Sequence, residues 1–102
     1  LTGRVLGYLD LVTRYYPTAD EVATIMGMTG RSFRRQLAVE QTTFRQLLDK
    51  ARYQKAAHYL QNAQFSVDYI AEQLGYSESA AFIHAFQRWT GKSPSTFRKV
   101  NF

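Results

Sequence analysis

Apolar residues recur at three- and four-residue intervals along the chain, and no stretch sustains a two-residue alternation. That spacing is typical of amphipathic helices, because it places the apolar side chains on one side of a helix. The pattern therefore predicts an all-α domain of about seven helices. The first is expected over about residues 2–15, and one of its sides would carry Val5, Leu6, Leu9, Val12 and Tyr16.

Capping residues mark the predicted helix boundaries in the first half of the chain. Thr18 and Glu21 have the spacing of a capping box and open a second helix. Gly27 is expected to end that helix, because glycine adopts the positive φ of a helix stop without strain. Thr29 then caps a third helix of about residues 30–39.

A second capping box, Thr43 with Gln46, predicts a long fourth helix over about residues 43–61. At ~1.5 Å per residue this helix would be ~28 Å long. Its inward side is predicted to consist of Phe44, Leu47, Leu48, Ala51, Ala56 and Leu60.

Similar signals divide the second half of the chain into three helices. Ser66 is predicted to cap a fifth helix, which ends at Gly75. Ser77 is predicted to cap a sixth helix of about residues 78–89. A proline close to the start of the last segment predicts a short seventh helix over about 94–100.

A seven-residue pattern occurs twice, at residues 22–28 (VATIMGM) and 70–76 (IAEQLGY), at a constant offset of 48. Both copies have the order apolar, alanine, two variable positions, apolar, glycine, apolar. The small alanine lets a second helix cross closely, and the glycine permits a sharp turn. The pattern predicts one DNA-binding domain over 1–102 with two helix-turn-helix units, of about 18–40 and 66–90, joined by the long helix. The ~28 Å length of that helix is close to the ~34 Å repeat of B-DNA, so the second helices of the two units would enter successive major grooves.

The second helix of each unit is predicted to have one buried and one free face. Its buried face would carry Phe33 and Leu37 in the first unit, and Phe82 and Phe86 in the second. The free face of the first unit carries Arg31, Arg34 and Arg35, which are predicted to contact DNA bases, because the guanidinium fork matches guanine or a phosphate. The alternative is an ordinary solvated charged face.

The equivalent free face of the second unit holds fewer charges. Its candidate base-contacting residues are Ser79, Ala80, Ile83 and His84. Such side chains are suited to recognising DNA shape and to contacting phosphates and thymine methyl groups. They are less suited to a bidentate contact with guanine. The first unit is therefore expected to supply more of the base discrimination.

The charge distribution agrees with two separate contacts on a polyanion. The net charge is +5 and the pI is about 9.7. Residues 31–55 hold seven basic and two acidic side chains, a balance of +5, and residues 84–102 hold four basic and no acidic ones, a balance of +4. Two basic segments predict two footprints on double-stranded DNA.

Several exposed cations and helix-start hydroxyls are candidates for DNA phosphate contacts. Ordinary helix capping is the alternative role of the hydroxyls, and Arg52 and Arg98 are equally suited to bracing helices through carboxylates. The candidate phosphate-contacting residues are Thr29, Arg45, Lys50, Ser77, Arg88, Lys92, Ser95 and Thr96.

Enzyme, metal-binding and membrane classes receive no support from the sequence. The chain has no cysteine, its two histidines, His58 and His84, stand alone, and no cofactor is predicted. No apolar run approaches the ~20 residues of a membrane span. Helical spacing assigns the following aromatic residues to the core in preference to single-strand stacking: Phe65, Tyr69, Phe82, Phe86, Trp89 and Phe97.

Two stretches are similar to the AraC/XylS family of regulators. They are residues 27–44 (GMTGRSFRRQLAVEQTTF) and 66–99 (SVDYIAEQLGYSESAAFIHAFQRWTGKSPSTFRK), and the likeness extends over about 17–99. The resemblance implies a bacterial, cytoplasmic transcription regulator, an activator or sometimes a repressor. It also implies base or backbone contacts for the free-face residues of both recognition helices. One departure is His84, where the family often has arginine.

The family resemblance also implies protein partners. A sensory or dimerisation domain usually precedes a domain of this kind, and a chain that starts at Leu1 is expected to be a piece of a longer protein. Activators of the family contact RNA polymerase as well. The acidic residues Asp68, Glu72 and Glu78 are candidates for such a contact, which makes a protein-interaction module the alternative function.

Overall fold

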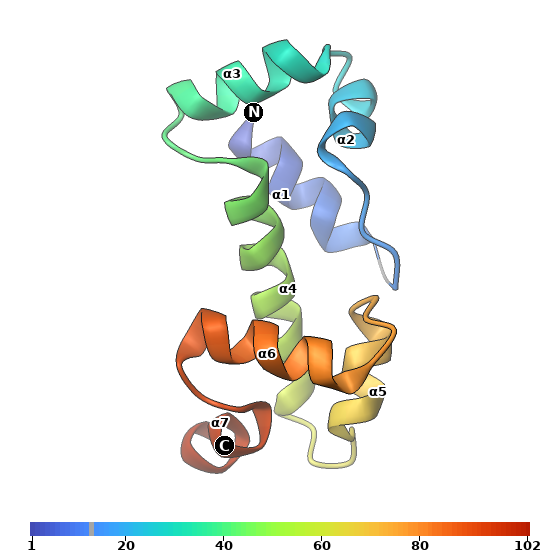
Figure 1. The fold of residues 1–102 in the computed structure, drawn as a ribbon, viewed down its shortest axis with the longest axis vertical. Helices are drawn as coiled ribbons and strands as arrows, with labels where there is room; N and C mark the ends of the chain where they lie inside the picture. Colours follow the sequence, from blue (N-terminus) through green and yellow to red (C-terminus); the bar gives the residue numbers. More distant parts are fainter. Residues whose placement is uncertain (13) are drawn as a thin grey trace. The chain divides into compact units, whose positions relative to one another are not determined.

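A computed structural model describes residues 1–12 and 14–102, and these residues form helices and connecting segments without a strand (Figure 1). The helices are α1 (Thr2–Leu11), α2 (Ala19–Ile25), α3 (Gly30–Val39), α4 (Phe44–Leu60), α5 (Val67–Gln73), α6 (Ser79–Thr90) and α7 (Pro94–Asn101). None of the helices in the described part of the chain combines the length and apolar character of a membrane span. The predicted all-α fold is confirmed.

Helix α1 ends earlier than the predicted boundary at residue 15. Its last residue is Leu11, and Val12 follows in an extended conformation with φ −84° and ψ 147°. Arg14 has a φ of 65°, and Tyr16 precedes Pro17, a position that disfavours the helical conformation. Val12 and Tyr16 are therefore half-buried outside the helix, and residue 13 lies outside the described residues.

The predicted caps of α2 and α3 are confirmed. Thr18 Oγ1 accepts from the Glu21 amide at 3.2 Å, and the Glu21 carboxylate accepts from the Thr18 amide at 3.3 Å, which completes the capping box. Thr29 Oγ1 accepts from the Ser32 amide at 3.1 Å. Each cap satisfies an amide that has no partner inside its helix.

The same chemistry starts α4 and α5. Thr43 Oγ1 accepts from the Gln46 amide at 3.2 Å, and the Gln46 side chain accepts from the Thr43 amide at 3.3 Å. Ser66 caps α5 by accepting from the Tyr69 amide at 3.0 Å. These two predicted caps are also confirmed.

The predicted cap of α6 is wrong. The residue at its N-cap position is Glu78, and that side chain makes no capping hydrogen bond. The turn before α6 is one residue longer than the turn before α3, because α3 begins three residues after Gly27 and α6 four residues after Gly75. Ser77 therefore lies one position too early, in the exposed turn.

The chain forms two compact units, and α4 contributes residues to both. Unit 1 consists of Leu1–Val12 and Tyr16–Ala51, and within it α2 packs against α3. Unit 2 contains residues 14, 15 and Arg52–Phe102, and within it α5 packs against α6 and α6 against α7. Each unit therefore holds one helix-turn-helix pair.

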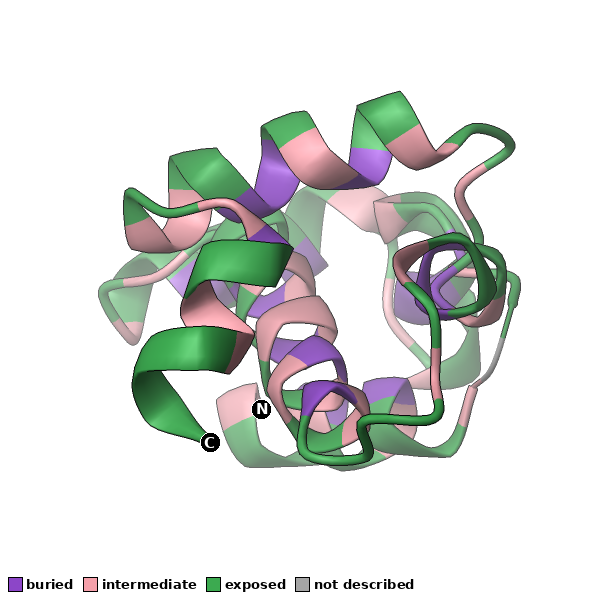
Figure 2. Cartoon of the chain, turned by 90° about the horizontal axis from the view of Figure 1, so that it is seen from below, coloured by how far each residue is buried: buried purple, intermediate pink, exposed green. Residues whose placement is uncertain are grey.

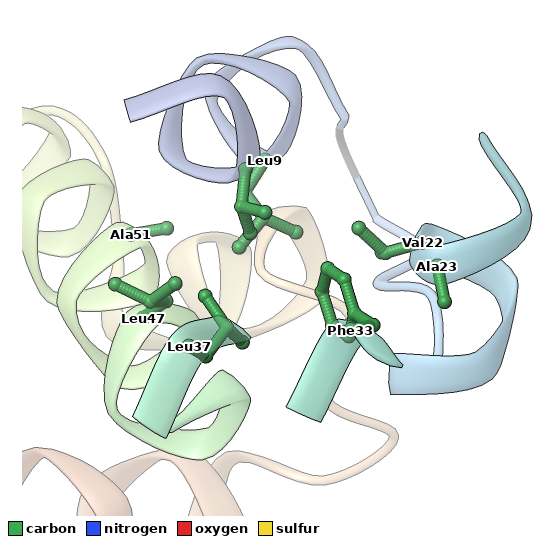
Figure 3. Close-up of a cluster of buried hydrophobic side chains, with 8 residues drawn as sticks. Leu9, Val22, Ala23, Phe33, Leu37, Leu47 and Ala51 are labelled. Atoms are coloured by element: carbon green, nitrogen blue, oxygen red, sulfur yellow. The ribbon is translucent and has the colours of Figure 1, made fainter. Parts of the chain in front are cut away.

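Each unit has its own apolar core. Buried and exposed positions occupy opposite sides of the helices (Figure 2), which is the arrangement that the apolar spacing predicts. The buried core of unit 1 (Figure 3) comprises Val5, Leu9, Val22, Ala23, Phe33, Leu37, Leu47 and Ala51. The buried core of unit 2 comprises Ala56, Leu60, Ile70, Ala71, Leu74, Phe82 and Phe86.

Candidate nucleic-acid interface

The two turns between paired helices have matching backbone hydrogen bonds. The Gly27 amide donates to the Thr24 carbonyl at 3.0 Å, and the Gly75 amide donates to the Glu72 carbonyl at 3.1 Å. The φ angles of these glycines, 73° and 84°, both lie in the left-handed region. The repeat in the sequence is thus a repeat of backbone geometry, which supports the predicted roles of both glycines.

Helix α3, the candidate recognition helix of the first helix-turn-helix, has an apolar face and a cationic face. Phe33 is fully buried in the core of unit 1. The exposed side chains around it are Arg31, Arg34 and Arg35, as the sequence predicts. Three arginines within about one helical turn give a surface whose donors suit guanine or phosphate oxygens.

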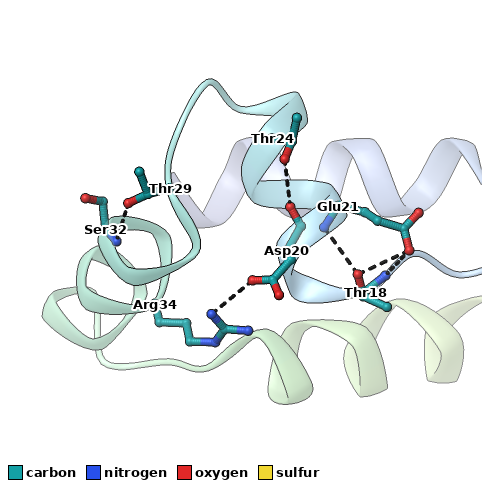
Figure 4. A network of polar contacts seen from close by, with 7 residues as sticks. All are labelled: Thr18, Asp20, Glu21, Thr24, Thr29, Ser32 and Arg34. Atoms are coloured by element: carbon teal, nitrogen blue, oxygen red, sulfur yellow. Dashed lines mark hydrogen bonds and ion pairs between the residues drawn. The ribbon is translucent and has the colours of Figure 1, made fainter.

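One of these arginines has an acidic partner in α2. Arg34 Nη1 lies 3.1 Å from Asp20 Oδ1, and both side chains stay largely exposed (Figure 4). The pair links the two helices of the first helix-turn-helix. Sequence reasoning missed it, because a contact between positions 20 and 34 depends on how α2 and α3 cross.

Helix α6, the candidate recognition helix of the second helix-turn-helix, has a mostly neutral outer face. Ala80 and His84 are exposed, whereas Ser79 and Ile83 are half-buried. The Ser79 hydroxyl donates to the carboxylate of Asp68 on α5. Asp68, a candidate for contact with a protein partner, is thus already tied to the recognition helix.

The candidate phosphate-contacting cations are all exposed. They are Arg45 and Lys50 in unit 1 and Arg88 and Lys92 in unit 2. Arg45 Nε lies 3.4 Å from Asp49 Oδ1, one helical turn further along α4. An exposed pair of this kind is weak and leaves the guanidinium open to another anion.

Of the candidate hydroxyls, Thr29 caps a helix, and the Thr96 hydroxyl accepts from the Ser93 hydroxyl at 3.0 Å. Thr29 has the capping role, and Ser77 lies in the turn before α6. Ser95 and Thr96 lie in the first turn of α7, whose actual cap is Ser93, since its hydroxyl accepts from the Thr96 amide at 3.2 Å. All four candidate hydroxyl residues are exposed.

A concave surface in unit 1 brings two sets of candidates together. A cavity of about 340 Å³ lies between α2, α3 and the start of α4. Arg34, a candidate for base contact, and Arg45, a candidate for phosphate contact, both line it, together with Thr43 at the start of α4. Recognition helix and phosphate candidates therefore share one face of this unit.

Arg98 and Arg52 have structural partners in unit 2. Arg98 donates to the backbone carbonyls of Leu60, Asn62 and Phe65, at 3.0, 3.2 and 2.6 Å. It braces α7 against the α4–α5 connection, through carbonyls and not through the carboxylates considered from the sequence. The guanidinium carbon of Arg52 lies 4.8 Å from the centre of the Tyr76 ring, a cation–π distance.

The aromatic residues have the core role that their spacing predicts, with one exception. Phe82 and Phe86 are fully buried, and Phe65, Trp89 and Phe97 are half-buried and pack against the core of unit 2. Tyr69 is 41% exposed, although its ring lies 4.9 Å from that of Phe65. Rings engaged in this way leave little free face for stacking on unpaired bases.

A second contact missed from the sequence involves Glu40, at the end of α3. Its carboxylate accepts from the Thr2 amide at 2.8 Å, from the Thr2 hydroxyl at 2.6 Å and from the Gln36 side chain at 2.9 Å. These bonds lower the pKa of Glu40 to about 2, the Thr2 hydroxyl contributing most. Glu40 thereby fixes the end of the recognition helix to the start of α1.

Comparison with known proteins places this geometry in a family. A family model described as a helix-turn-helix domain matches residues 22–100. The HTH-type transcriptional regulator VqsM of Pseudomonas aeruginosa is 45% identical over 98 residues, a match that covers 96% of this chain and 30% of VqsM. The chain thus spans between 24% and 39% of the length of the curated relatives that it matches.

Solved structures of transcriptional regulators have the same fold. The crystal structure of the transcriptional regulator CdpR from Pseudomonas aeruginosa has a TM-score of 0.90 and 35% identity, covering 96% of this chain and 31% of CdpR. The DNA-binding domain of AdpA, solved in complex with a target DNA, shares the fold with a TM-score of 0.83 at 23% identity, covering 97% of this chain and 90% of that one. The chain belongs to the AraC-type helix-turn-helix family of DNA-binding transcriptional regulators.

Proposed function

We propose that this domain binds double-stranded DNA sequence-specifically through α3 and α6, which enter successive major grooves as the output of a bacterial transcription activator. The observation that carries the proposal is the division of α3. Arg31, Arg34 and Arg35 are exposed, while Phe33 and Leu37 of the same helix are buried. An outer face of this kind, on the second helix of a helix-turn-helix, is suited to a major groove.

The length of α4 supports the placement of two recognition helices on one duplex. α4 runs without a break through 17 residues, or ~26 Å at ~1.5 Å per residue, which suits two readers on one duplex. The match covers only 30% of VqsM, so the domain is one part of a longer chain in that relative. A sensory or dimerisation domain in the intact protein is part of the proposal and rests on the family. Contact with RNA polymerase, and action in the cytoplasm, are part of the same proposal and rest on the family alone.

The base-contacting role of α3 is tested with DNA selected by the protein itself. A duplex bound by the chain is enriched from a randomised pool, and dissociation constants are measured for the wild type and for Arg34→Ala with Arg35→Ala. Each lost base contact is expected to cost ~1–3 kcal/mol and to relax the sequence preference.

Arg4→Ala, which removes an exposed arginine of α1, serves as the matched control and is expected to leave the preference unchanged. If the double variant binds the selected duplex as tightly and as selectively as the wild type, α3 is not the recognition helix.

A further inference from the structure

Asp20 forms an ion pair with Arg34, one of the three exposed arginines of α3. It is the second residue of α2, and its carboxylate is 3.1 Å from the Arg34 guanidinium (Figure 4). An isolated arginine on a helix surface samples many rotamers, whereas one amino group of this guanidinium faces a carboxylate, which favours the rotamers that keep the two in contact. The guanidinium has five donors, so the other edge remains available.

The residue beneath this ion pair is a glycine. A Cβ added to Gly30 would collide with Asp20 Oδ1 and would lie 2.8 Å from Arg34 Nη1. Both contacts involve the ends of flexible side chains and not backbone. A larger residue at position 30 would therefore displace the Asp20–Arg34 pair and leave the fold intact.

The second helix-turn-helix offers an internal comparison. Asp68 corresponds to Asp20 at the offset of 48, and Ser79 corresponds to Gly30 at the offset of 49 that follows the longer turn. There the serine hydroxyl donates to the aspartate, and the position of Arg34 is taken by Ile83. The aspartate at this position is thus bonded to a serine hydroxyl in the second unit and to an arginine guanidinium in the first.

We propose that Asp20 is a specificity-determining positioning residue, which holds Arg34 toward one base of the DNA site and away from phosphates. A carboxylate at the DNA surface repels phosphates. In a complex where Arg34 does not contact its base, this repulsion is not offset, so such a complex is disfavoured. A held guanidinium also loses less conformational freedom when it forms a bidentate contact. The inference rests on the proposed function, since it assigns a partner to an arginine that contacts DNA.

The experiment uses the selected duplex and its single base-pair variants. The base pair contacted by Arg34 is the one at which Arg34→Ala no longer discriminates. The measured quantity is the ratio of dissociation constants between the duplex changed at that base pair and the selected duplex. Asp20→Asn keeps the shape of the side chain and removes its charge, and it is expected to lower this ratio about three- to tenfold.

Asp20→Asn should also tighten binding to unrelated DNA, because a negative charge near the phosphates is lost. A purely structural role of Asp20 would instead weaken binding to all duplexes by the same factor. In an Arg34→Ala background, Asp20→Asn is expected to leave the ratio unchanged, since the side chain that it positions is gone.

Two further variants use the repeat as a control. Gly30→Ser gives Asp20 the partner that Ser79 gives Asp68, and it should reproduce the lowered ratio of Asp20→Asn. Asp68→Asn makes the same substitution in the second unit, where an amide oxygen still accepts from Ser79. It is expected to leave the ratio at the Arg34 base pair unchanged.

The results separate the two proposals. If Arg34→Ala abolishes discrimination at one base pair while Asp20→Asn and Gly30→Ser retain the full ratio, the positioning role is overturned and the proposed function stands. If Arg34→Ala changes no ratio at any base pair, α3 does not contact bases through this residue, and the positioning role is overturned with that part of the proposed function.

Discussion

Glu40 shows how one side chain can secure the position of a recognition helix. It follows α3 directly and accepts hydrogen bonds from Thr2 at the start of α1 and from Gln36 within α3. The start of a helix carries unpaired amides and a positive dipole end, so a carboxylate is favourable there. Glu40 thus joins the end of α3, the helix that carries the arginines, to the start of α1.

The lowered pKa of Glu40 predicts a dependence of stability on pH. Folding lowers the pKa from 4.5 to about 2, so the folded state favours the ionised carboxylate. The stabilisation is therefore complete above pH 4.5 and is lost as the pH falls toward about 2. Glu40→Gln should remove this part of the pH dependence, measured as the free energy of unfolding in urea at successive pH values.

Glu72→Gln removes an exposed glutamate of α5 and serves as the control. Its stability is expected to keep the wild-type loss between pH 4.5 and about 2. A Glu40→Gln profile that falls as steeply as that of the wild type over this interval would show that the carboxylate is not held by Thr2 in solution.

At the scale of elements, local chemistry accounts for most of what the sequence predicted. Thr18, Thr29, Thr43 and Ser66 all start helices at the predicted places, because a cap involves residues only three positions apart. The two recognition helices were located because their apolar faces recur with the helical period. The exposed arginines of α3 follow from that face and were predicted correctly.

Features that depend on the length of a turn or on the packing of helices were predicted wrongly or missed. Ser77 has the composition of a cap, but the turn before α6 is one residue longer than its counterpart, which moves the N-cap position to Glu78. The contacts of Arg98 with the α4–α5 connection join residues 33 to 38 positions apart, so no local pattern contains them. The Asp20–Arg34 pair likewise depends on how two helices pack.

The turn between α2 and α3 permits a prediction about glycine. Gly27 has a φ of 73°, and a Cβ there would meet nothing within 4 Å, so alanine would be disfavoured by backbone conformation alone. Gly27→Ala is expected to destabilise the chain by ~1–2 kcal/mol. The measurement is the free energy of unfolding in urea, at neutral pH.

Gly7→Ala is the matched control, because Gly7 lies inside α1 and a Cβ there also meets nothing within 4 Å. The helical backbone suits alanine, so this variant is expected to be more stable by ~0.5–1 kcal/mol. Equal effects of the same sign at both positions would contradict the left-handed conformation of the turn.

For the whole molecule, the question is whether both units hold the same duplex at once. Basic side chains concentrate in residues 31–55 and 84–102, and these segments belong mainly to unit 1 and to unit 2 respectively. Each cation that neutralises a phosphate releases counterions, so its contribution appears in the salt dependence of binding. Two engaged units would therefore contribute separately to one slope.

Lys50 on α4 and Lys92 before α7 test this arrangement, one from each unit. Four exposed candidate cations predict a slope of log K against log salt of about −3.6 or steeper, at about −0.9 per phosphate. Lys50→Gln and Lys92→Gln should each reduce the steepness by about 0.9, and the double variant by about 1.8. Arg4→Gln on α1 should not change it. Additive losses require both units on one duplex, whereas a slope that Lys92→Gln leaves untouched would mean that only the first unit is bound.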